Sequence, residues 1–175
     1  VNGRLKRGVY AKDIILRIIA DLGVKGGLGY AYEYNGPAIH ALSMEERMTI
    51  CNMSIEGGAR VGYVNPDETT FDYIKGRRYA PKDEGFDRAL SFWKGLASQE
   101  DAEYDDVYTL DADRLEPMVT WGINPGHAIG VSERTPVPQE LGEAERESAE
   151  KAYEHMGFEP GEPMKGKKID VAFLG

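Results

Sequence analysis

Residues Arg47–Gly58 read RMTICNMSIEGG, and both fold and function are best argued outward from this stretch. Between Met48 and Ile55 it carries no charge, and its apolar side chains point in almost every direction around a helical wheel. A helix that is apolar all round is usually buried. Ser43, with Glu46 three residues later, has the spacing of a capping box, so we expect a buried helix from Ser43 to about Gly58.

Two strongly polar residues, Asn52 and Glu56, interrupt this apolar run. They are four residues apart, so they project from one face of a helix. Buried amides and carboxylates need partners, or they cost several kcal/mol, roughly. Glu56 also precedes Gly57 and Gly58, which favour a helix end, and an anion there opposes the helix dipole. Stability alone would not favour this arrangement.

The segment Thr49–Ala59 resembles a motif of the aconitase superfamily, the iron–sulfur dehydratases that move a hydroxyl group between adjacent carbons. Val24–Tyr30 and Tyr34–Pro37 match the same superfamily. Asn65–Tyr73 and Val119–Gly126 resemble its isopropylmalate dehydratase branch rather than true aconitases. The resemblance covers nearly the whole chain.

The resemblance implies a three-layer α/β/α fold for residues 1–175, as one domain taken from a longer chain of several domains. It corresponds to the second domain of the family, and residues 136–163 look like a variable connection within it. The alternation of helical and strand patterns independently indicates the α/β class. We expect helices at 13–22, 43–58, 70–75, 86–96 and 143–156, and strands at 30–34, 107–110, 117–121 and 169–174.

For the site, the resemblance implies that Glu56 is an active-site carboxylate paired with a histidine from another domain. It implies that Asn52 hydrogen-bonds near the sulfurs of a 4Fe–4S cluster. The alternatives from the residues alone are a structural carboxylate tied to an arginine or to backbone amides, and a hydrogen-bonded core asparagine. Cys51 belongs to neither ligand segment of the family, and one thiolate cannot hold a cubane, so we interpret it as a core cysteine.

The implied activity is a hydro-lyase reaction that isomerises isopropylmalate by dehydration and rehydration, with a separate small subunit completing the substrate cleft. Homoaconitase is the nearest rival enzyme, and a non-catalytic interaction module is the alternative from another class. Because the family's cluster cysteines, first-domain histidines and substrate-binding arginines are not in these 175 residues, we expect the chain alone to bind no cluster and to be inactive.

Composition narrows the class of protein further. The chain has 175 residues, 41% of them hydrophobic, which suits one domain with a sizeable core. A net charge of −9 argues against a nucleic-acid surface. A single cysteine is typical of a reducing cytoplasm, and no apolar run reaches the ~20 residues of a membrane span. The chain does not begin with Met, so it looks excised from something longer.

Other candidate sites have simpler interpretations. Residues 26–29, Gly-Gly-Leu-Gly, fail the dinucleotide pattern and favour a turn. Residues 111–113 lack the spacing of a calcium loop, and 122–126 suit a tight turn after a strand. His40, His127 and His155 have no metal-ligand spacing and stay unassigned.

Overall fold

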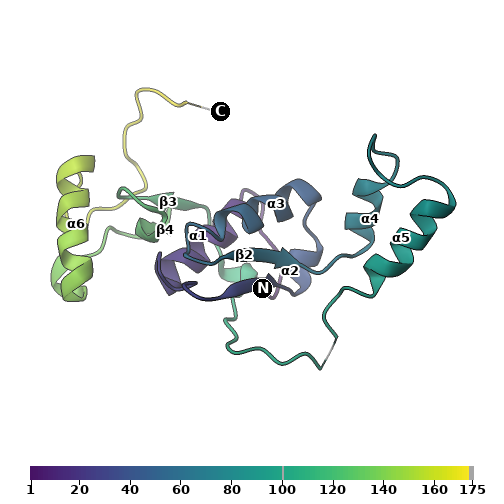
Figure 1. The fold of residues 1–175 in the computed structure, drawn as a ribbon. Helices are drawn as coiled ribbons and strands as arrows, with labels where there is room; N and C mark the ends of the chain where they lie inside the picture. The colour runs from purple at the N-terminus through teal and green to yellow at the C-terminus, as the bar shows by residue number, and fades with distance from the viewer. Residues whose placement is uncertain (100, 174–175) are drawn as a thin grey trace.

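The computed structural model describes residues 1–99 and 101–173. Its helices are α1 (Ala11–Leu22), α2 (Pro37–His40), α3 (Met44–Met53), α4 (Glu68–Ile74), α5 (Glu84–Lys94) and α6 (Glu143–Met156). Its strands are β1 (Ala31–Tyr34), β2 (Val61–Val64), β3 (Met118–Thr120) and β4 (Ala128–Gly130). Short 3-10 helices lie at Ala112–Arg114, Pro125–His127 and Pro138–Glu140. The body around α1 and α3 lies between an α4–α5 hairpin at one end and α6 at the other (Figure 1).

Helix α1 lies at the centre of the main core, as its apolar spacing predicts. Its buried side chains include Ile14, Ile15, Ile18 and Ile19. Asp13 in the first turn is also buried, and its carboxylate accepts the Tyr10 N–H at 2.7 Å and the Met118 N–H at 2.7 Å. One carboxylate therefore caps α1 and ties the start of β3 to it.

The α/β class is confirmed, although the sheets are small. In the part of the chain that the structure describes, β1 pairs with β2 in parallel and β3 pairs with β4 antiparallel, two strands in each sheet. We did not predict β2, because Gly62 interrupts its apolar pattern. That glycine lies against α3, where an added Cβ would be 2.7 Å from the Cys51 Cα. Close helix–strand packing therefore explains a residue that weakens the strand signal.

The predicted helices at 70–75, 86–96 and 143–156 are confirmed as α4, α5 and α6, with bounds shifted by at most two residues. The strand predicted at 117–121 is confirmed as β3. The strands predicted at 107–110 and 169–174 are wrong as far as the described residues reach, because no neighbouring strand lies alongside to complete a ladder. A segment with the composition of a strand stays an extended segment outside any sheet when no neighbouring strand pairs with it. Leu174 lies outside the described residues.

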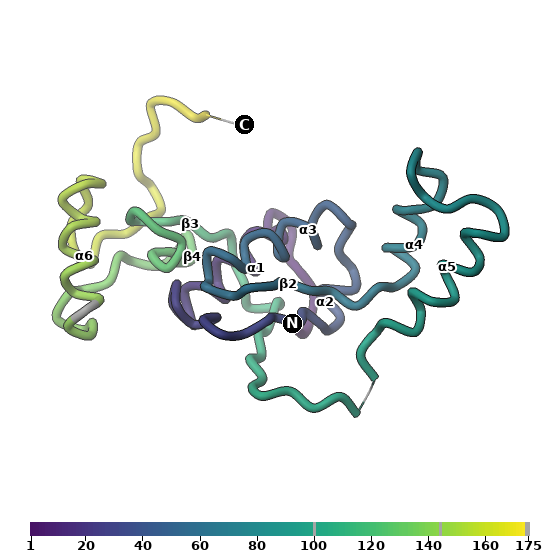
Figure 2. The backbone as a smooth tube through the Cα atoms, viewed as in Figure 1, coloured from purple at the N-terminus to yellow at the C-terminus, as the bar shows by residue number. Residues whose placement is uncertain are grey.

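Two peripheral units are held by aromatic side chains. In the α4–α5 hairpin, the Trp93 ring stacks on Phe71 at 6.4 Å and meets Phe86 edge-on at 5.9 Å. In α6, Tyr153 stacks on Trp121 at 4.9 Å within a second small core. The backbone trace in Figure 2 shows the α4–α5 hairpin and α6 at opposite ends of the body. Residues 136–163 thus contain an ordered helix, and their variability among relatives stays a prediction.

Candidate active site

The helix predicted from Ser43 begins as expected and ends in a different manner. Glu46 N–H donates to Ser43 Oγ at 3.3 Å, while Ser43 N–H donates to the Glu46 carboxylate at 2.9 Å, which confirms the capping box. Regular α-helix ends at Met53, and tighter turns continue to Gly58. There Ala59 N–H bonds to the Ser54 carbonyl and Gly58 N–H to the Ile55 carbonyl, with Gly58 at φ +87°. These two bonds form a Schellman motif at the predicted end.

The prediction that this helix is buried all round is wrong. Within α3 only Arg47 and Ile50 are buried, whereas Met48 is 38% exposed. Ile55, beyond its end, is 60% exposed. The helix packs against α1, β2 and α4, whereas Met48 and Asn52 are exposed. Its uncharged surface therefore faces solvent in this chain.

Asn52 and Glu56 both lie on this exposed side, so the prediction that they are buried is wrong as well. No hydrogen bond or ion pair joins either side chain to another residue among those described. Glu56 is consequently not a structural carboxylate tied to an arginine or to backbone amides within the described chain. The roles of Asn52 and Glu56 in catalysis stay predictions.

The backbone around Glu56 is held firmly even though its side chain is exposed. Gly27 N–H, in the loop after α1, donates to the Gly57 carbonyl at 2.8 Å. A Cβ added at Gly27 would lie 2.5 Å from the Ala59 nitrogen, and one at Gly58 would lie 3.0 Å from the Val24 carbonyl. Two glycine-containing loops thus pack backbone to backbone, which fixes the turn that carries Glu56.

This packing also shows whether residues 26–29 form a phosphate-binding loop or a turn. The amide N–H groups of Gly26, Gly27 and Leu28 all donate to carbonyls of this chain. Amides that are already paired do not cradle a phosphate. The loop is a turn between α1 and β1, as the sequence indicates.

Cys51 lies half-buried against the main core, and burial raises the pKa of its thiol. It is the single cysteine of the chain, and a cubane cluster needs three or four thiolates. Across residues 1–99 and 101–173, no three His, Cys, Asp or Glu side chains gather in a way that could hold a metal ion. The residues present therefore do not form the ligand set of a 4Fe–4S cluster.

Sequence reasoning missed the buried polar residue of α3, which is Arg47. Its side chain is 2% exposed, and its guanidinium bonds both carboxylate oxygens of Asp67, at 2.6 and 2.7 Å, and the His40 carbonyl at 3.0 Å. The Arg47 guanidinium lowers the pKa of the Asp67 carboxyl. Arg47 lies on the same helical face as the buried residues Ile50 and Ser54, and this spacing could have indicated that Arg47 is buried.

A second buried polar contact links α3 to β1. Tyr34 and Ser54 share a hydrogen bond of 2.7 Å between their hydroxyls, and Ser54 Oγ also donates to the Ile50 carbonyl at 3.0 Å. Burial raises the pKa of Tyr34. Both contacts fix the helix that precedes the Glu56 turn.

The three histidines do not come together. His40 and His155 are exposed. His127 stacks on Trp121 at 4.5 Å, bonds Ser148 through Nε2 at 3.2 Å, and has its pKa lowered by burial. His127 ends the short 3-10 helix that follows residues 122–124, where the sequence predicts a tight turn. Asp111 makes a local bond as well, since its carboxylate accepts the Asp113 N–H.

None of the helices in the described ranges is long and apolar enough to cross a membrane.

Comparison with known proteins places these features in a family. The model of the aconitase family (aconitate hydratase) matches residues 1–175. The chain is 61% identical over all its residues to a 3-isopropylmalate dehydratase large subunit of Rippkaea orientalis, and 60% identical to one of Crocosphaera subtropica. A third, from Synechococcus sp. JA-3-3Ab, is 61% identical. The chain spans 37–38% of the length of these relatives. This chain belongs to the aconitase family.

Proposed function

We propose that the chain is part of the large subunit of a 3-isopropylmalate dehydratase, a hydro-lyase that converts 2-isopropylmalate to 3-isopropylmalate in leucine biosynthesis. The support is identity of about three residues in five to large subunits of that name, over every residue of this chain. Because the chain spans little more than a third of those relatives, the rest of the active site belongs to the remainder of the polypeptide and to a small subunit.

The dehydration step needs groups that transfer protons, and an exposed carboxylate such as that of Glu56 can assist in this. Dehydration removes a proton from the carbon next to a carboxylate and delivers a proton to the departing hydroxyl. Glu56 is exposed, without a partner among the described residues, on a turn fixed by loop packing. The sequence identity carries the proposal for the whole chain, and this observation supports the part that concerns Glu56: its carboxylate is free to pair with a group that the described chain does not supply.

In the assembled enzyme, the Glu56 carboxylate accepts the N–H of a histidine from another part of the polypeptide. It thereby orients the imidazole and stabilises it when protonated. Asn52, one helical turn earlier, would be the residue of this chain that hydrogen-bonds near the cluster. The 4Fe–4S cluster would act as a Lewis acid on the hydroxyl, and its ligands would come from the remainder of the polypeptide.

The test uses the longer polypeptide that contains these residues, purified with its small subunit and treated with iron and sulfide without oxygen. Formation of the conjugated alkene isopropylmaleate is followed by ultraviolet absorbance. We expect turnover of isopropylmalate and far slower turnover of homoaconitate. The opposite preference would assign a homoaconitase instead. A loaded cluster without turnover of either substrate would favour a non-catalytic module.

The 175-residue chain alone, treated in the same way, is expected to bind no cluster and to catalyse nothing. Absorbance in the charge-transfer band of the cluster, together with turnover, would contradict this. We also propose a cytoplasmic location, since the single cysteine suits a reducing compartment. No nucleic acid or membrane partner is proposed.

A further inference from the structure

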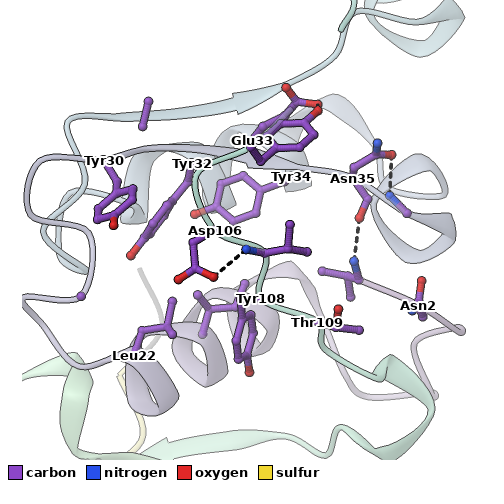
Figure 3. A pocket seen from close by; sticks show the side chains of 17 residues that line it. Asn2, Leu22, Tyr30, Tyr32, Glu33, Tyr34, Asn35, Asp106, Tyr108 and Thr109 are labelled. Carbon is purple, nitrogen blue, oxygen red and sulfur yellow. Dashed lines mark hydrogen bonds between the residues drawn. The ribbon is translucent and has the colours of Figure 1, made fainter. Parts of the chain in front are cut away.

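A cavity of about 600 Å³ lies beside β1, and its lining does not include Glu56. Figure 3 shows it bounded by β1 on one side, by Leu22 near the end of α1, and by the passage that carries Asp106, Tyr108 and Thr109. The cavity is partly open to solvent, so it is a groove in the surface rather than a void in a packed core.

One wall of the cavity is an unpaired strand edge. β1 pairs only with β2 in the described chain. The Tyr30 carbonyl accepts Arg60 N–H on the β2 side, so the backbone groups of the intervening residues Ala31 and Glu33 face the cavity. Asn35 follows the same alternation, and its carbonyl already accepts a bond from the Val1 nitrogen at 2.6 Å. Such an edge is a template for a further strand.

The opposite wall has the composition of a strand but no ladder. Residues 107–110, Val-Tyr-Thr-Leu, are the segment for which the sequence predicts a strand. At its end, the Leu110 carbonyl accepts Asn2 N–H at 2.8 Å, and Ala112 N–H donates to the Asn2 carbonyl at 2.8 Å. By the same alternation, the N–H and C=O of Tyr108 also face the cavity.

Val1 and Asn2 thus bridge the two walls at one end of the cavity. Asn2 forms a parallel bridge with Asp111 on the far wall. On the near wall, Val1 lies opposite Gly36, where an added Cβ would be 2.5 Å from the Val1 carbonyl oxygen. Both walls therefore run parallel to the backbone at Val1 and Asn2, and that backbone points into the cavity.

We propose that the cavity is the seat of an extended β-strand, the segment of the same polypeptide that leads into Val1. Counted back from Val1 opposite Gly36, about five residues would lie opposite Ala31–Asn35, a span of ~16 Å at ~3.3 Å per residue. The strand pairs in parallel with β1 on one side and with residues 107–110 on the other. Two unpaired edges and β2 thereby become one sheet of four strands.

The side chains around the cavity define the chemistry of this strand. Ile18 and Leu22 of α1 line one face, so alternate residues of the strand are apolar. The inference rests on the part of the proposed function that places this chain in a longer polypeptide, which its 37–38% share of the relatives supports. It also gives the reason why the strand expected at 107–110 is absent: its partner is not among these residues.

Residue-resolved amide hydrogen exchange on the longer polypeptide, purified with its small subunit, tests the proposal with an internal control. Tyr32 N–H faces β2 and is protected in either case. We expect Ala31 and Glu33 N–H to exchange as slowly as Tyr32, at least about 100-fold below unstructured rates. Unstructured rates at Ala31 and Glu33, beside a protected Tyr32, would overturn the proposal.

Two further readouts identify the occupant. Protection of Ala31 and Glu33 that depends on protein concentration would assign the edge to a second copy, and protection that needs the small subunit would assign it to that partner. Either result would overturn the proposal. Turnover of isopropylmalate is measured on the same sample to distinguish failure of this inference from failure of the proposed function. An active enzyme with an unprotected β1 edge would refute only the added strand.

Discussion

The ion pair between Arg47 and Asp67 is unequal, and this inequality gives the sharpest stability prediction. The Arg47 side chain is 2% exposed, whereas that of Asp67 is 37% exposed. Removing one partner of a fully buried pair costs ~3–5 kcal/mol, because the other charge stays buried and uncompensated. Which partner is removed therefore decides the cost.

Asp67→Asn leaves the guanidinium of Arg47 buried without a counter-charge. Because water reaches the Asp67 position, we take the lower end of that range, about 3 kcal/mol of lost unfolding free energy. Asn caps a helix about as well as Asp, so the bond from Thr70 N–H that starts α4 is retained. Arg47→Met keeps an apolar stem in place and leaves the exposed carboxylate to water, for a loss of about 1 kcal/mol.

The assay is urea-induced unfolding of the 175-residue chain as a double-mutant cycle. The variant with both substitutions should be about as stable as Arg47→Met alone, since no buried charge is left without a partner. That corresponds to a coupling of about 3 kcal/mol between the two side chains. A loss for Arg47→Met that equals or exceeds the loss for Asp67→Asn would refute the reasoning.

Three further predictions concern single groups. The lowered pKa of Asp67 means that its stabilisation is complete above the unfolded value of ~3.9 and is lost as pH falls through the lower folded value, so urea midpoints of wild type and Asp67→Asn should converge below about pH 4. Gly27→Ala forces a methyl onto Ala59 and should lower the unfolding free energy by about 1–3 kcal/mol, whereas Gly85→Ala in α5 meets nothing closer than 3.8 Å and should cost nothing. The Cys51 thiol, with its raised pKa, should react with iodoacetamide at pH 7 more slowly than a cysteine peptide does.

Each of these has an outcome that contradicts it. Midpoints that stay equally far apart down to pH 2 would remove Asp67 from the acid transition. Equal stability of the two glycine variants would mean that the loop packing is looser than described. Alkylation of Cys51 at the peptide rate would place its thiol in solvent.

Local signals in the sequence were sufficient where one segment determines its own structure. The Ser43 capping box and the α1 stripe depend on residues three or four apart, and both were predicted. Burial of Arg47 depends on Asp67, twenty residues away, and no local pattern indicates that pairing. Residues 107–110 have the composition of a strand, but a strand exists only with a partner.

Exposure of the candidate site could not be predicted from its own composition. An uncharged helix is read as buried because apolar surface normally has a covering element, and here the cover is not among the described residues. The glycines that were read as a helix end proved to serve a second purpose, close packing against the loop after α1. The motif at Thr49–Ala59 therefore indicated the family correctly, whereas the predicted burial of its helix was wrong.

The most direct test of the central claim is Glu56→Gln in the assembled enzyme, with Glu45→Gln in the first turn of α3 as the matched control. Because Glu56 is exposed and has no partner within the described chain, the substitution should leave the unfolding free energy of the 175-residue chain unchanged, and the assembled variant should still load its cluster. Turnover of isopropylmalate should fall by roughly two orders of magnitude, the usual scale for an acid–base group. Near-normal turnover with a full cluster, or a turnover loss matched by Glu45→Gln, would contradict the assignment of Glu56 to the active site.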